Sequence, residues 1–227
     1  MFGSSSSYSS IPKQGISGAS TVSFNNVTSK YTINFDGKAI ETTVTDISTI
    51  VDRWVKEIII LYAGKSFVVV GLDVKWRPKF SRYKNNKAAT LQLCVDDKCL
   101  ILQLFHILKL PRSLKNFLMN PTFTFVGDEV ADDISKIKNE YGLNCGSHAD
   151  IRKLLISKKW PLCYGMSWLG LKKLASGLYG LNMLRPLHIY ESDWRSRFLS
   201  IEQVEYASID AYAYYKIGHK LLKNGRS

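Results

Sequence analysis

The segment Phe67-Val68-Val69-Val70-Gly71-Leu72-Asp73-Val74-Lys75-Trp76 constrains the fold of this chain more than any other. Its apolar run with three consecutive valines predicts a buried strand. Residues two apart on a strand point to the same face, so Lys75 is expected beside Asp73. A carboxylate delivered by a buried strand suggests a metal site or a general base, and the neighbouring lysine complicates both.

Composition sets broad limits on the class of protein. The chain has 227 residues, of which 45% are hydrophobic, which is enough for one sizeable core or one domain with a tail. Lysine and arginine total 31 against 19 acidic residues, for a formal charge of +12. Such a surplus favours a polyanionic partner such as nucleic acid or an anionic membrane surface, although many soluble basic proteins bind no nucleic acid.

The cysteines and apolar runs indicate an intracellular protein, in the nucleus or the cytoplasm. None of the four cysteines belongs to a Cys-x-x-Cys pair, and no histidine stands at zinc-ligand spacing beside them. The first residues contain no apolar signal region, and the longest apolar runs are too short to span a bilayer. We therefore expect reduced thiols and no membrane partner.

The first half of the chain predicts a tail followed by a hairpin, a helix and three strands. Residues 1–29 are rich in serine and glycine, which predicts a disordered N-terminal tail. Residues 30–46 alternate around Asp36-Gly37, a strong hairpin signal. Asp46 is expected to cap the helix that follows. Residues 91–93 and 99–104 predict two strands beyond the valine strand.

The second half alternates between helical and strand patterns. It ends in a helix that the capping box Ser200-Ile201-Glu202-Gln203 starts and that runs to about Leu222, with residues 223–227 as a C-terminal tail. The other expected elements are helices over 112–119, 132–141, 151–156 and 169–178 and a strand over 123–126. Residues 30–222 thus predict one α/β domain with a mixed central sheet flanked by helices.

Three aspartates and one tyrosine are candidates for a site. Asp73 ends the buried strand, Asp133 begins a helix after a strand, and Asp210 lies one helical turn after Tyr206. Each has a structural explanation when taken singly. Asp133 could interact with a helix dipole, Asp210 could be a solvated helix residue, and Tyr206 could belong to the core.

Taken together and in order, three segments resemble the 3′–5′ exonucleases of ribonuclease H-like fold. They are Gly71–Trp76, Gly127–Ile137 and Tyr206–Tyr212. The resemblance covers about residues 35–222 and is closest to the Werner-type and ribonuclease D-like branch, especially its plant members. It implies a ribonuclease H-like fold and hydrolysis of phosphodiester bonds at single-stranded or recessed 3′ ends of RNA or DNA.

The resemblance also implies roles for the candidate residues. Asp73, Asp133 and Asp210 would hold one or two Mg²⁺ or Mn²⁺ ions, and Tyr206 would orient the attacking water. Carboxylates suit this task because hard divalent ions prefer oxygen ligands, and paired ions stabilise the charge that develops on the phosphate. Asp128 and Asp132 compete with Asp133 for its role, and Asp133 fits the family spacing to Lys136.

Lys75 departs from the family, which has a glutamate at this position. Four carboxylates balance two Mg²⁺ ions, whereas three carboxylates and one ammonium balance only one. The second ion could be weakened or lost, the ammonium could replace it and contact the phosphate, or the flexible Lys75 side chain could turn away and form a salt bridge with a neighbour. The resemblance then implies either a 3′–5′ exonuclease of reduced activity or a catalytically inactive nucleic-acid-binding or scaffold protein of the same fold.

A basic loop follows the valine strand and is a second candidate for contact with nucleic acid. Its cations neutralise phosphates and its aromatic rings stack on unpaired bases, while a solvated surface loop is an equal alternative. The residues assigned to this contact are Arg77, Lys79, Arg82, Tyr83 and Lys84. The choice of RNA or DNA and a homo-oligomeric assembly stay open. The chain has no Gly-x-Ser-x-Gly elbow and no phosphate loop, which argues against two unrelated α/β enzyme classes.

Overall fold

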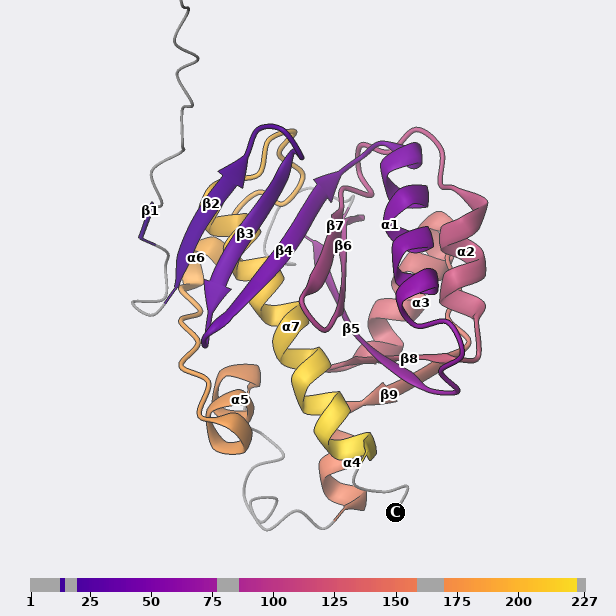
Figure 1. The fold of residues 1–227 in the computed structure, drawn as a ribbon, viewed down its shortest axis with the longest axis vertical. Coiled ribbons are helices and arrows are strands. Elements are labelled where there is room, and N and C mark those ends of the chain that lie inside the picture. The colour runs from indigo at the N-terminus through magenta and orange to yellow at the C-terminus, as the bar shows by residue number, and fades with distance from the viewer. Residues whose placement is uncertain (1–12, 15–19, 77–85, 159–169, 224–227) are drawn as a thin grey trace, which may run out of the picture.

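The computed structural model describes residues 13–14, 20–76, 86–158 and 170–223 (Figure 1). The strands are β1 (Lys13–Gln14), β2 (Thr21–Asn25), β3 (Lys30–Phe35), β4 (Lys38–Thr45), β5 (Val68–Trp76), β6 (Ala88–Val95), β7 (Lys98–Leu102), β8 (Phe123–Gly127) and β9 (Ser147–Asp150). The helices are α1 (Ser48–Leu61), α2 (Arg112–Met119), α3 (Val130–Tyr141), α4 (Ile151–Ser157), α5 (Leu171–Tyr179), α6 (Leu187–Tyr190) and α7 (Ile201–Lys223).

The described strands form one mixed sheet in the order β1-β2-β3-β4-β7-β6-β5-β8-β9. Strands β1 to β4 pair antiparallel in succession, and β4 then pairs in parallel with β7. Strand β5 lies inside the sheet, antiparallel to β6 and parallel to β8. The predicted α/β class with a mixed central sheet flanked by helices is therefore confirmed.

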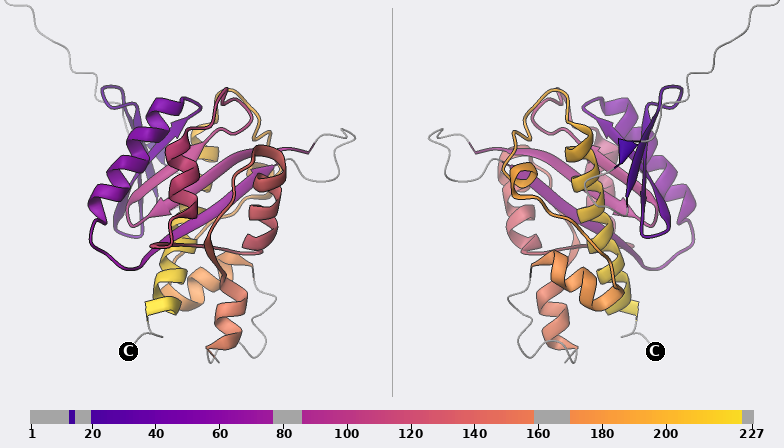
Figure 2. Two further views of the ribbon diagram at one scale, coloured as in Figure 1. Left: turned by 90° about the vertical axis from the view of Figure 1, so that its right-hand side faces the viewer. Right: turned by 90° about the vertical axis from the view of Figure 1, so that its left-hand side faces the viewer.

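Helices cover both faces of the sheet, as the two side views show (Figure 2). The even-numbered residues from Val68 to Val74 pack with α1, α2 and α3 in one buried cluster. Val69 belongs to the other cluster, which contains residues of α4, α5 and α7. Because successive side chains of a strand point to opposite faces, the odd-numbered positions from Val69 to Lys75 face α7.

Gly71 permits α7 to cross β5 at close range. A Cβ atom at this position would lie 2.0 Å from the carbonyl oxygen of Ala211 and 2.6 Å from the backbone nitrogen of Tyr215. Any other residue would therefore push α7 away from the sheet. The crossing brings the next two side chains on the same face of β5, those of Asp73 and Lys75, toward the first half of α7.

The predicted N-terminal tail is wrong for its last part. Strand β2 pairs antiparallel with β3, and Val22 is 4% exposed against the core. Thr21-Val22-Ser23-Phe24 alternates polar and apolar residues, and the serine-rich composition of the surrounding stretch hides this signal. Residues 1–12 and 15–19 lie outside the described part of the chain.

Two helix starts differ from those predicted. Helix α1 begins at Ser48 with Ile47 as its N-cap, and Asp46 does not cap it. The Asp46 carboxylate instead forms an ion pair with Arg197, with Nη1 2.5 Å from Oδ2. Helix α3 begins two residues earlier than predicted, after Glu129 in a left-handed conformation. The short elements β9 and α6 were not predicted, because few residues carry their pattern.

The predicted capping box is confirmed at the start of α7. The Ser200 backbone N–H donates to Gln203 Oε1 at 2.9 Å, and the Gln203 backbone N–H donates to Ser200 Oγ at 3.2 Å. We expect Ser200→Ala to lower the free energy of unfolding by about 1 kcal/mol, because one helical N–H loses its acceptor. Urea denaturation measures this, with Ser176→Ala at an exposed position inside α5 as the control. Equal stability of the two variants would contradict the expectation.

Cys94, Cys99 and Cys145 are free and buried, in agreement with the expected reduced thiols, and Cys163 lies outside the described residues. Among the described helices, none is both long enough and apolar enough to span a bilayer.

Candidate active site between β5 and α7

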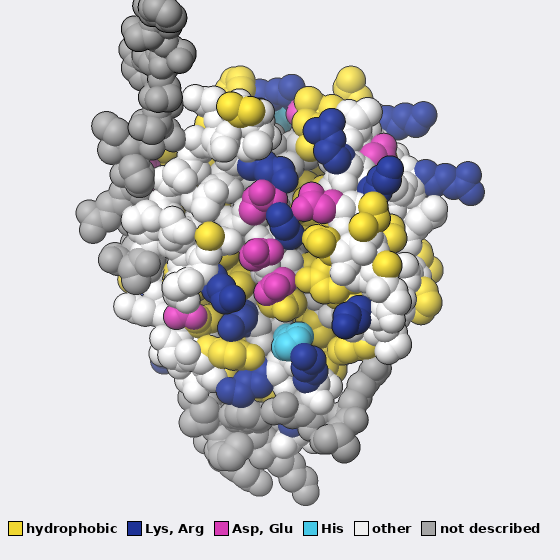
Figure 3. Space-filling model, in the orientation of Figure 1, with side chains coloured by type: hydrophobic (Ala, Val, Ile, Leu, Met, Phe, Trp, Pro, Cys, Tyr) yellow, Lys and Arg dark blue, Asp and Glu magenta, His cyan; other side chains and the backbone are white. Residues whose placement is uncertain are grey.

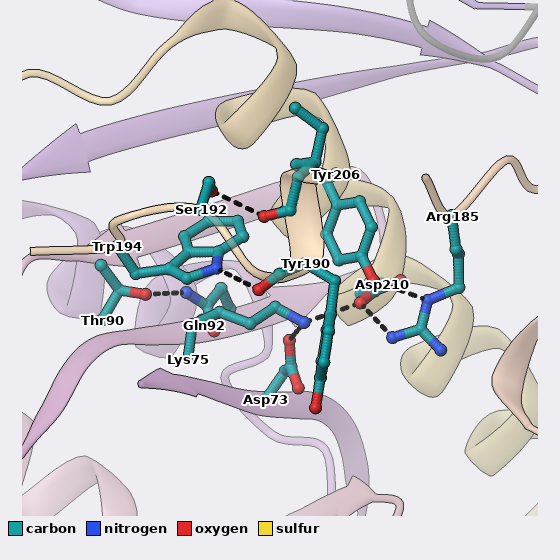
Figure 4. A network of polar contacts seen from close by, with 11 residues as sticks. Asp73, Lys75, Thr90, Gln92, Arg185, Tyr190, Ser192, Trp194, Tyr206 and Asp210 are labelled. Carbon is teal, nitrogen blue, oxygen red and sulfur yellow. Dashed lines mark hydrogen bonds and ion pairs between the residues drawn. The ribbon is translucent and has the colours of Figure 1, made fainter. Parts of the chain in front are cut away.

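Three predicted site residues meet where β5 faces α7 (Figure 4). Lys75 Nζ lies 2.6 Å from Asp73 Oδ2 and 2.7 Å from Asp210 Oδ2, so the ammonium bridges two carboxylates from different elements. Tyr206, one turn before Asp210, places its ring 4.9 Å from the same nitrogen. Lys75 therefore does not turn away from the site, and its salt bridges are made with the predicted metal ligands themselves.

The structure adds a second cation, Arg185, that the sequence analysis missed. Its Nη2 lies 2.9 Å from Asp210 Oδ2, and its Nε donates to the hydroxyl of Tyr206 at 3.1 Å (Figure 4). Arg185 lies in the irregular segment before α6, which has no periodic pattern. No spacing signal in the sequence connects it with Asp210.

Aromatic rings hold the Lys75 ammonium in place. Besides Tyr206, the ring of Trp194 has its centroid 5.8 Å from Nζ. The Trp194 indole N–H donates to the carbonyl of Tyr190 at 3.1 Å, which fixes the ring (Figure 4). A cation beside an aromatic face is stabilised by the ring quadrupole, so the site is shaped to keep a positive charge.

Burial and the neighbouring charges shift the pKa of Lys75 in opposite directions. Burial by itself would lower the pKa of Lys75, but the nearby charges of Asp210 and Asp73 outweigh it and raise the pKa. Lys75 therefore stays protonated at neutral pH. Burial also raises the pKa of Tyr206 to about 12, and the charge of Asp210 adds to this, so the phenol keeps its proton.

Asp133 approaches the site from α3. The structure distinguishes it from its two sequence competitors: Asp133 is buried, Asp132 is exposed, and Asp128 accepts a hydrogen bond from Arg152 Nη2 at 2.7 Å. Burial raises the pKa of Asp133 to about 9, and the charge of Asp73 adds to the shift. With no ion beside it, Asp133 is mostly protonated at neutral pH.

A pocket of about 800 Å³ opens in front of this group. Asp73, Lys75, Asp133, Arg185 and Tyr206 all line it. Asp210 is 1% exposed and is covered by the two cations that it pairs with. The three predicted aspartates thus surround one site, but only two of them reach the pocket wall.

The side chains of this site do not fit a pair of divalent ions as they stand. Asp73 Oδ2 is buried and accepts no well-oriented hydrogen bond, which would suit a metal ligand. However, the Lys75 ammonium lies 2.6 Å from this oxygen and occupies the place of an ion. Asp210 Oδ2 contacts both Lys75 and Arg185. In the part of the chain that the structure describes, no three Asp, Glu, His or Cys side chains are grouped so as to hold a metal ion. The metal roles of Asp73, Asp133 and Asp210 stay predictions.

Comparison with known proteins decides the family. Residues 48–226 match the model of a family described as 3′–5′ exonuclease. The chain belongs to the 3′–5′ exonuclease family. A 3′–5′ exonuclease of Arabidopsis thaliana is 33% identical over 162 residues, which are 68% of this chain and 52% of the relative. This confirms the resemblance drawn from the three sequence segments.

Other relatives extend the comparison. The bifunctional 3′–5′ exonuclease/ATP-dependent helicase WRN of Mus musculus is 28% identical over 161 residues, 66% of this chain and 11% of WRN. The crystal structure of Escherichia coli RNase D superposes with a TM-score of 0.65 at 19% identity, covering 80% of this chain and 44% of RNase D. The fold is therefore the ribonuclease H-like fold of these exonucleases. The chain spans about half the length of its Arabidopsis relative and a much smaller share of WRN.

The face of the molecule drawn in Figure 3 does not show a single basic track over the described residues. On the face shown in Figure 3, Lys and Arg side chains are spread out, and acidic side chains lie among them near the middle. The five residues of the predicted nucleic-acid-binding loop, within residues 77–85, lie outside the described part of the chain. Their role stays a prediction.

Proposed function

We propose that this chain acts on the 3′ ends of RNA or DNA strands as a 3′–5′ exonuclease, and that its hydrolysis is slow because Lys75 replaces an acidic residue. Family membership supports the reaction class, and the pocket lined by Asp73, Asp133 and Tyr206 is the place for the strand end. The observation that carries the reduced rate is the bridge that Lys75 makes between Asp73 and Asp210.

The charges of the site support the slow rate. Lys75 and Arg185 supply two positive charges, which match the negative charges of Asp73 and Asp210 when Asp133 is protonated. A site that is already neutral offers an incoming dication much less attraction than a cluster of free carboxylates does. The ion would also have to separate the ammonium from two buried partners, which costs free energy.

A second candidate function is the binding of strand ends without hydrolysis. The contacts of Arg185 with Asp210 and Tyr206 favour it, because they engage two of the four residues to which the resemblance assigns a catalytic or metal-binding role. Arginine also recognises phosphate well, through its several N–H donors.

One assay separates the two functions. Purified protein is incubated with 5′-labelled single-stranded RNA and DNA, and with duplexes that have a recessed 3′ end, in Mg²⁺ or Mn²⁺. We expect wild type to shorten a strand from its 3′ end, and Lys75→Glu to do so at least about tenfold faster, a gain of about 1.4 kcal/mol in transition-state stabilisation.

The controls identify the source of any activity. Asp133→Asn and Asp210→Asn should both be inactive, and their circular dichroism spectra show whether they are folded. Shortening that persists in both variants would come from a contaminating nuclease. Wild type that binds strands but never shortens them, even at high enzyme concentration, would replace the first proposal by the second.

A further inference from the structure

We propose that the Lys75 ammonium is a resident cation that replaces a divalent ion between Asp73 and Asp210, and that the pocket binds a nucleic acid strand end, with Arg185 as its phosphate contact, without any divalent ion. The second half of this proposal rests on the proposed function, because it takes the strand end as the ligand. The first half concerns the protein alone.

The position of Lys75 Nζ supports the first half of the proposal, that the ammonium replaces a divalent ion. It lies 2.6 Å from a carboxylate oxygen on β5 and 2.7 Å from one on α7. A cation that bridges two carboxylates from separate elements relieves their mutual repulsion and fixes the helix against the strand. Divalent ions play this part in a carboxylate site, and here a side chain of the protein plays it.

The ammonium has little freedom to leave this position. Lys75 is 5% exposed, and the rings of Tyr206 and Trp194 lie near its nitrogen. Moving it out would leave Asp73 as a buried carboxylate without its ammonium partner and would leave Asp210 with Arg185 alone, which is strongly unfavourable. The resident cation is therefore part of the folded structure and does not exchange with solution ions.

The contacts and exposure of Arg185 support the second half of the proposal, the binding of a strand end. Its Nη2 and Nε are held by Asp210 and Tyr206, and a guanidinium has five N–H donors, so these two contacts do not exhaust it. The side chain is 25% exposed and lines the same pocket as Asp73 and Lys75. A charged group that is oriented in this way is prepared to donate to a phosphate oxygen at the end of a strand.

Thermal unfolding tests the resident cation without nucleic acid. Wild type, Lys75→Glu and Lys75→Met are melted in EDTA and in millimolar Mn²⁺, with Lys115→Glu as the matched charge change at an exposed position of α2. We expect the Tm of wild type and Lys115→Glu to be the same in both solutions. Lys75→Glu should melt about 10 °C below wild type in EDTA, because it buries a third carboxylate beside two others, and should regain most of this in Mn²⁺.

Two results would overturn the resident cation. The first is a wild-type Tm that rises in Mn²⁺ as much as that of Lys75→Glu. The second is calorimetric titration in which wild type binds Mn²⁺ as tightly as Lys75→Met does. Because the second comparison uses Lys75→Met, the test stands even if Lys75→Glu does not fold.

Fluorescence anisotropy with a 5′-labelled single strand tests the phosphate contact. We expect wild type to bind equally well in EDTA and in Mg²⁺, and Arg185→Met to bind about tenfold more weakly in both. Lys115→Met should bind as wild type does. Binding that requires Mg²⁺, or that Arg185→Met leaves unchanged, would overturn the second half of the proposal.

The two experiments distinguish the failure of this inference from that of the proposed function. Wild type that binds no strand in either solution would refute strand-end binding and the proposed function together, and the melting result would still decide the role of Lys75. Strand shortening by wild type together with strong Mn²⁺ stabilisation would uphold the proposed function and refute the resident cation.

Discussion

Gly71→Ala is expected to destabilise the protein by at least about 3 kcal/mol, which is a large fraction of the stability of a typical domain. The added Cβ would lie 2.0 Å from the Ala211 carbonyl oxygen and 2.6 Å from the Tyr215 nitrogen, and both are backbone atoms of α7. A helix backbone cannot yield as a flexible side chain does, so the whole of α7 would have to move away from β5. Urea denaturation followed by circular dichroism measures the loss.

Gly170→Ala is the matched control for this change. Gly170 has a φ of −63°, and a Cβ there would have no other atom within 4 Å. Its variant should stay within about 1 kcal/mol of wild type, since only a modest N-cap preference is lost. If Gly71→Ala proved as stable as Gly170→Ala, the close crossing of β5 and α7 would be wrong, and the geometry of the site would be wrong with it.

Asp210→Asn is expected to cost about 3–5 kcal/mol of unfolding free energy, although it changes a single charged group to a neutral one of the same shape. Asp210 is 1% exposed, and its Oδ2 is shared by Lys75 and Arg185. Without its charge, the buried Lys75 and the partly buried Arg185 are left with one carboxylate, that of Asp73, close by. Asp97→Asn makes the same charge change at an exposed turn and should have little effect.

A double-mutant cycle with Lys75→Met shows whether the loss comes from this pairing. If Lys75 and Asp210 stabilise each other, the double variant should be more stable than the sum of the single losses predicts, by at least about 1 kcal/mol. Strict additivity would mean that the two side chains do not interact, and it would also remove the physical basis of the resident cation.

The sequence predicted most of the secondary structure and the residue types of the site. The apolar run of β5, the hairpin at Asp36-Gly37 and the capping box at Ser200 are local signals, and the structure contains all three. The order of the acidic segments indicated the family, which the comparison with known proteins confirms. Strand β2 was missed because a composition signal over a long stretch concealed a short alternation.

The site itself could be predicted only in part. Asp73, Lys75, Tyr206 and Asp210 were selected from motifs, and the structure brings them together. Arg185 was not selected, because an irregular segment positions it and irregular backbone follows no residue period.

The sequence by itself determined that Gly71, Asp73 and Lys75 share one face of a buried strand, because side-chain direction along a strand is set by local backbone geometry. Only the tertiary structure decided what that face meets. Lys75 and Asp210 are 135 residues apart, and their contact depends on how closely α7 packs on β5. The partner of a buried charge is fixed by such packing, since local rules give the direction of a side chain and not the element that lies opposite it.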